Sequence, residues 1–341
     1  MEGQLVIPVL FRGDHFHFIF RLDPPGHSRD GGTDLAAAES PNRQGSYQLT
    51  ERLRMKKILL QTTIPYTQDD WSIERFSTLA EILSAFSDEH GNRKFRVVGR
   101  NRDDPGNVDD NVLKRLDETD FDQLWLFGVD VGGGITPMEC EAIARFRARG
   151  GGLLTSRDHQ DLGLSFSSLG DIGDAHHFHS RNPESDPARL VVDDTETSSI
   201  SYPNYHSGKN GDYQHVTVME PVHTVMRSNI NRSGRIELLP SHPHEGANSI
   251  PVGIKSGRII ATGTSILTGR AFNLLLAFEA DRGQGRAIVD SSFHHFLDYN
   301  LDPDKGCPSY VTEPAGSELK DNPRARIDTE TYFLNLAEWL S

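Results

Sequence analysis

Residues 150–163 constrain the fold of this chain more than any other segment. They begin with three glycines, continue with the short apolar run 153–155, and end abruptly in serine, aspartate, histidine and glutamine. A buried parallel strand has this pattern when it delivers polar side chains to the carboxyl edge of a sheet, where open α/β folds bind their ligands. The segment therefore predicts an α/β fold and the place of its functional site.

Strand and helix patterns alternate from Met55 onward. Short apolar runs predict strands, and amphipathic spacing or capping residues predict the helices between them. Such alternation with short connections is typical of an open, mostly parallel, flavodoxin-like sheet with helices on both faces. The predicted strands are 57–61, 95–98, 123–127, 153–155, 236–239, 258–263 and 287–289, and the predicted helices are 71–86, 107–116, 136–149, 271–279 and 329–340.

The 341 residues suffice for one large α/β domain with insertions, which we place at 55–341. Regular periodicity is lost over 164–235, so we expect an insertion after the strand 153–155 that covers the strand edge. Residues 1–54 contain one alternating segment and then a polar tract rich in glycine, proline, serine and aspartate. They lack the basic region and apolar core of a secretory signal. We therefore expect a poorly ordered or dispensable N-terminal extension.

Composition excludes several classes of partner. The formal net charge of −14 argues against a nucleic-acid partner, which needs a basic face. No apolar stretch approaches the roughly 20 residues that span a bilayer, so no membrane partner is expected. Two cysteines, Cys140 and Cys307, cannot build a disulfide framework, and unpaired thiols indicate a reducing cytoplasm.

Three clusters of polar residues follow predicted strands and carry the candidate chemistry. They come after 153–155, 236–239 and 287–289. Because parallel strands point the same way, we expect the clusters to converge at one carboxyl edge around a small-molecule ligand, together with Asp130. The candidate catalytic residues are Ser156, Asp158, His159, Glu245 and His294, and the candidate substrate-binding residues are Asp130, Gln160, Asp290 and His295.

One mechanism open to these residues uses a serine nucleophile. Ser156 would attack, His294 would act as its base, and Asp290 or Glu245 would orient the imidazole. Ser156 lacks the glycine surroundings of a sharp nucleophile turn. The pattern therefore favours acid–base or metal chemistry.

The other mechanism uses a divalent metal, with zinc, iron or manganese as candidates. His242 and His244 would bind the metal together with one of His159 or His294. The metal would activate water, and Glu245 or Asp158 would act as the base.

Each cluster also has a purely structural interpretation. Ser156 or Asp158 could cap the next helix, and residues 242–244 could form a solvated turn fixed by proline. His294 and His295 lie between two phenylalanines, so one imidazole could be a hydrogen-bonded core residue. Consecutive residues also point in different directions, so the two histidines need not share a role.

Two motifs carry a family resemblance over 56–301. Ser156 is followed three residues later by the pair His159-Gln160, and a late strand runs into Phe293-His294. In these respects the chain resembles the class I glutamine amidotransferase-like superfamily, and within it the ThuA-like (trehalose-utilisation-like) branch. There the first strand ends in a nucleophilic cysteine, and the late strand runs into Phe-His-Pro-Glu. Here serine replaces the cysteine, and His295-Phe296 replaces Pro-Glu.

The resemblance implies the fold and the location of the site. Glutaminase chemistry needs a thiolate activated by histidine, so the missing cysteine excludes it. We expect a hydrolase-type enzyme acting on a small polar molecule, for which a carbohydrate-related compound is one candidate. The alternative is a non-catalytic binding or regulatory member of the same fold. Members of this superfamily often pair through the sheet edge or surface helices, so the resemblance also implies a homo-oligomer.

Overall fold

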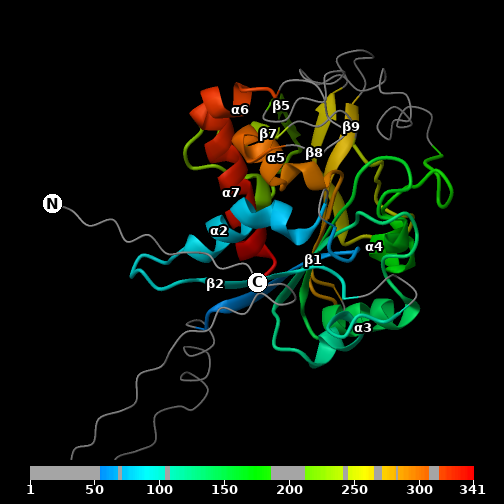
Figure 1. Ribbon diagram of the computed structural model, residues 1–341. Coiled ribbons are helices and arrows are strands. Elements are labelled where there is room, and N and C mark those ends of the chain that lie inside the picture. Colours follow the sequence, from blue (N-terminus) through cyan, green and yellow to red (C-terminus); the bar gives the residue numbers. More distant parts are fainter. Residues whose placement is uncertain are drawn as a thin grey trace, which may run out of the picture. The chain divides into compact units, whose positions relative to one another are not determined.

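The computed structural model describes residues 54–67, 71–103, 108–185, 212–240, 245–264, 271–281, 283–306 and 315–341 (Figure 1). The expected extension lies outside these residues except for Arg54, and so do His242, His244 and Cys307. Among the described helices, none combines the length and the apolar character needed to cross a membrane.

One large sheet organises the described part of domain 55–341. Its strand order is β2-β1-β3-β4-β10-β9-β8-β6, and β5 and β7 form a separate antiparallel pair. The block from β2 to β10 pairs in parallel, whereas β9, β8 and β6 continue in antiparallel fashion. The order of the parallel block is the flavodoxin-like one, which confirms the predicted fold class. The strands are β1 (Lys56–Thr62), β2 (Phe95–Arg100), β3 (Gln123–Phe127), β4 (Gly152–Ser156), β5 (Tyr213–His215), β6 (Thr217–Val218), β7 (Leu238–Pro240), β8 (Gly257–Thr264), β9 (Ala271–Phe278) and β10 (Ala287–Asp290).

Helices cover both faces of the sheet, with α2 and α7 apart from α3 and α4 in Figure 1. Along β1, Ile58 and Leu60 belong to a core shared with α2 and α7, whereas Leu59 between them belongs to a core shared with α3. Burial on both faces explains why the parallel strands are continuous apolar runs. The helices are η1 (Ile73–Phe76), α2 (Ser77–Ala85), η2 (Leu113–Glu118), α3 (Pro137–Ala148), η3 (Leu164–Ser168), α4 (Asp171–Asp174), η6 (Thr224–Met226), η7 (Phe293–His295), α5 (Asp298–Leu301), η8 (Pro303–Lys305), α6 (Glu318–Asp321) and α7 (Pro323–Trp339).

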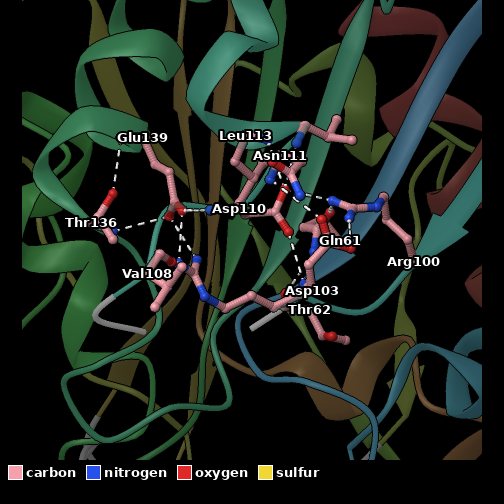
Figure 2. A network of polar contacts seen from close by, with 12 residues as sticks. Gln61, Thr62, Arg100, Asp103, Val108, Asp110, Asn111, Leu113, Thr136 and Glu139 are labelled. Atoms are coloured by element: carbon pink, nitrogen blue, oxygen red, sulfur yellow. Dashed lines mark hydrogen bonds and ion pairs between the residues drawn. The ribbon is translucent and has the colours of Figure 1, made fainter. Parts of the chain in front are cut away.

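A buried polar network fastens the loops after β2 and β3 to the start of α3 (Figure 2). The side chains of Arg102 and Glu139 are fully buried, and the two terminal guanidinium nitrogens, Nη1 and Nη2, each donate to one carboxylate oxygen at 2.7 Å. Glu139 also closes a capping box with Thr136, the residue that directly precedes α3. Arg102 donates further hydrogen bonds to the carbonyls of Val108 and Gly134. The loops that border this part of the carboxyl edge are therefore held by paired charges.

The predicted helix 271–279 is wrong, because this segment is the strand β9. It pairs with β10 on one side and β8 on the other, and nearly all of it is buried. A buried strand in the middle of a sheet is apolar on both faces, so its sequence lacks the alternation that separates strands from helices.

Other predicted boundaries also need correction. The predicted helix 71–86 is interrupted, since η1 precedes α2 and Trp71 is not helical. The predicted helix 107–116 is the 3-10 segment η2. The strand predicted at 236–239 is β7, which lies outside the large sheet, so the assumption that its cluster follows a parallel strand is wrong. Within the expected insertion, β6 joins the large sheet beside β8.

Candidate functional site

The carboxylate of Asp158 lies between two imidazoles. Its Oδ2 is 3.0 Å from Nδ1 of His159 and 3.5 Å from Nε2 of His294. Asp158 is 1 % exposed and His294 4 % exposed, whereas the His159 side chain is 20 % exposed. One buried carboxylate oxygen therefore faces both imidazoles, and His159 is the member of the group that solvent reaches. We call these three residues the outer layer.

Hydrogen bonding assigns the two nitrogens of His294 different roles. Nδ1 lies 3.0 Å from the amide oxygen of Asn300. Because an amide oxygen only accepts, Nδ1 carries the proton of that bond. Nε2 is thus the nitrogen that can exchange a proton with Asp158. The Ser292 hydroxyl donates to the other oxygen of Asp158 at 3.4 Å.

A third imidazole, that of His295, is fully buried and lies between two carboxylates. Its Nδ1 is 2.9 Å from Asp290, and its Nε2 is 3.6 Å from Glu245; all three residues are fully buried. Burial alone lowers the pKa of His295, but the charges of Asp290 and Glu245 outweigh it and raise this pKa to about 10. Tyr332 donates to Asp290 at 2.6 Å, and burial followed by that negative charge raises the Tyr332 pKa well above its usual value. We call His295, Asp290 and Glu245 the inner layer.

Ser156 belongs with the inner layer. It is fully buried, and its hydroxyl donates to Asp290 Oδ1 at 3.4 Å. Ser292 joins the two layers, since its backbone N–H donates to Asp290 and its hydroxyl donates to Asp158. A serine nucleophile needs a base for its proton, and here the hydroxyl faces a carboxylate that already accepts from His295 and Tyr332.

Arg157 supports the outer layer and was not predicted from the sequence. Its fully buried guanidinium donates to the carbonyls of Gln160 at 3.1 Å and Leu162 at 3.2 Å, and also to those of Asp158 and His177. These bonds tie the loop after β4 to a residue of the expected insertion. A charged residue after a buried strand does not reveal such a role, because its acceptors are backbone groups.

Two predicted binding residues, Asp130 and Gln160, belong to neither layer. Asp130 accepts hydrogen bonds from the backbone of Gly132 at 2.8 Å and from the hydroxyl of Ser165 at 2.8 Å. It therefore braces the loop after β3 against η3. Gln160 is exposed and has a left-handed backbone with φ of 54°.

The metal hypothesis concerns residues that the structure only partly describes. Within the described ranges, no group of three or more His, Cys, Asp or Glu is arranged to hold a metal ion. His242 and His244, the two proposed ligands, lie outside those ranges.

Comparison with known proteins gives similarity at the level of the fold. No family model and no curated protein matches the chain. Among solved structures, the mmIFT52 N-terminal domain is 12 % identical with a TM-score of 0.47, covering 73 % of this chain and 91 % of that one. The Trypanosoma brucei CTPS glutaminase domain with bound acivicin is 11 % identical with a TM-score of 0.37, covering 83 % of this chain and 94 % of that one. Similarity this low carries no argument about chemistry, and the fold assignment rests on the strand order.

Proposed function

We propose that this protein is a hydrolase-type enzyme that acts on a small polar molecule by general acid–base chemistry. The observation that carries the proposal is the single oxygen of Asp158 that faces the imidazoles of His159 and His294. Histidine is the side chain best suited to move protons near neutral pH, and a buried carboxylate is the usual group that orients it.

Each member of the outer layer has a distinct part in this proposal. Asp158 holds Nδ1 of His159, so that Nε2 of His159 takes a proton from the attacking water. His294 lies on the buried side, where its unprotonated Nε2 can take a proton from Asp158. The proton that His159 takes from water passes to the leaving group as the substrate bond breaks. His159 is the residue that meets the substrate, because it is the most exposed of the three.

The proposal also uses the resemblance to the class I glutamine amidotransferase-like superfamily and its ThuA-like branch. That resemblance rests on individual residues of the sequence. Ser156 stands where that superfamily has its cysteine, and it is buried against Asp290. We therefore propose a member of this fold without glutaminase chemistry, and a carbohydrate-related compound is one candidate substrate. Metal-activated water at His242 and His244 is the competing version of the same hydrolysis.

A substrate-class screen tests the proposal. The full chain is assayed against chromogenic esters, glycosides, phosphate esters and amides, beside Asp158→Asn, His159→Gln and the control His90→Gln, whose side chain is 73 % exposed. We expect hydrolysis of one class, lost by about 100-fold or more in the first two variants and unchanged in the control. Circular dichroism establishes that the variants are folded.

Two results would replace the proposal. Wild-type protein that hydrolyses no class, yet shifts its melting temperature with one of these compounds, is a binding module. A stoichiometric metal that is lost in His242→Ala together with activity would support the metal version.

A further inference from the structure

Trp71 has a backbone conformation that bulky residues rarely adopt. Its φ is 58°, in the left-handed region, where a side chain with a Cβ is strained. The two residues that follow it are firmly held. The Ser72 hydroxyl donates to the carbonyl of Thr67 at 2.6 Å, and the N–H of Ile73 donates to the side chain of Asn101 at 2.8 Å. Such strain persists where the surroundings enforce it, and it concentrates at functional sites.

The Trp71 indole lies against the imidazole of His294, the more buried histidine of the outer layer. Its ring centroid is 5.2 Å from that of His294, with the planes at 82°, and 5.3 Å from that of Phe293. Phe293 in turn stacks on His294 at 4.7 Å. The imidazole is thus held by two aromatic rings, while Asn300 and Asp158 face its nitrogens.

We propose that Trp71 is a positioning residue that fixes the plane of the His294 imidazole so that Nε2 faces Asp158. It acts through His294 and does not itself transfer protons. The imidazole can turn only about its Cβ–Cγ bond, and the stacked Phe293 ring and the nearly perpendicular indole both obstruct that turn. Within the described residues, Asp158 faces His294 directly and His159 lies beyond it. The proposal rests on the proposed function, because the positioning matters only if Nε2 exchanges protons.

The chain contains a matched control pair. Trp339 packs edge-on against His223 at 4.8 Å and 75°, close to the geometry of Trp71 and His294. The two pairs can therefore be compared in one spectrum. The histidine side chains are labelled with ¹³C and ¹⁵N. The chemical shifts of their carbon-bound protons report ring currents from a neighbouring indole. The ¹⁵N chemical shifts report which ring nitrogen carries the proton.

We expect Trp71→Leu to displace the carbon-bound proton resonances of His294 and to convert its nitrogen pattern from one with Nδ1 protonated to an average of two tautomers. Trp71→Phe should keep the wild-type nitrogen pattern. Trp339→Leu should displace the His223 resonances and leave those of His294 in place. Unchanged His294 resonances in Trp71→Leu would overturn the proposal.

Kinetics on the substrate found by the screen provide the second arm. Trp71→Leu should lower kcat by about 10-fold or more with KM unchanged, and Trp71→Phe should recover most of the loss. A raised KM at constant kcat would instead make Trp71 a binding surface and overturn a positioning role. If the screen finds no substrate, the proposed function fails, while the spectra still decide whether Trp71 fixes His294.

Discussion

The Ser156 hydroxyl donates to Asp290 at the point where β4 and β10 pair side by side, and these two residues are direct partners in the parallel register. The 3.4 Å bond is long, and both residues are fully buried. Ser156 is thus part of the buried support of the site.

We expect Ser156→Ala to leave catalysis largely intact. The variant removes one weak hydrogen bond, a cost of about 1 kcal/mol in stability, and removes no group of the outer layer. Its kcat/KM should fall by less than about 5-fold, against about 100-fold or more for Asp158→Asn. Equal losses in both variants would return Ser156 to the role of nucleophile.

Arg157→Met should destabilise the protein strongly. Methionine fills part of the space but leaves the buried carbonyl of Asp158 and the partly buried carbonyls of Gln160 and Leu162 without this donor, at a cost of about 3 kcal/mol or more in total. Urea unfolding measures the loss. Arg145→Met is the control, because Arg145 is 53 % exposed and its pairing with Asp117 contributes about 1 kcal/mol or less. Comparable losses would show that the Arg157 guanidinium does not hold the loop.

The inner layer gives stability a specific dependence on pH. The pKa of His295 in the folded protein is about 10, above its ordinary value of 6.5. The protonated imidazole therefore stabilises the fold fully below pH 6.5, and this contribution is lost as the pH rises toward 10.

His295→Gln tests this dependence. The difference in free energy of unfolding between wild type and variant should be largest at pH 6 and shrink steadily up to pH 10. Urea unfolding at five pH values measures it, with His90→Gln as the exposed control. A difference that is constant across this range would mean that His295 is neutral in the folded protein.

The left-handed backbone of Trp71 predicts an inverted order of stability for two small substitutions. Alanine keeps a strained Cβ at this φ and glycine does not, so Trp71→Gly should be more stable than Trp71→Ala by about 0.5–1 kcal/mol. At the exposed helical residue Ser84 the order should be the ordinary one, with alanine above glycine by about 1 kcal/mol. The same order at both positions would argue against a left-handed Trp71.

The carboxyl edge was predictable because its strands have strong local signals. Gln123–Phe127 was located to the residue, 153–155 falls one residue short of β4 at each end, and 287–289 falls one residue short of β10 at its end. Glycines, apolar runs and the Thr136-Pro137 start of α3 act within a few residues, so sequence alone reveals them. The strand β9 escaped prediction because its environment, not its own pattern, decides between helix and strand.

The division of the site into layers could not be predicted. His294 and His295 are adjacent in sequence, yet one faces Asp158 and the other Asp290 and Glu245. That choice depends on the direction in which η7 leaves β10 and on partners far away in the chain. Trp71 was missed for the same reason, since its contacts come from η7. Arg157 was missed because its acceptors are backbone carbonyls.

The reversal of strand direction between β10 and β9 also bears on the order of assembly. The β8-β9-β10 meander pairs segments that are close in sequence, whereas β10 meets β4 only after a long excursion of the chain. Local pairings close small loops and form early, and distant ones must first overcome a larger loss of chain entropy. We therefore expect the residues after β10 to meet those after β4 late in folding. The outer layer is then completed only when the β8-β9-β10 meander docks against β4.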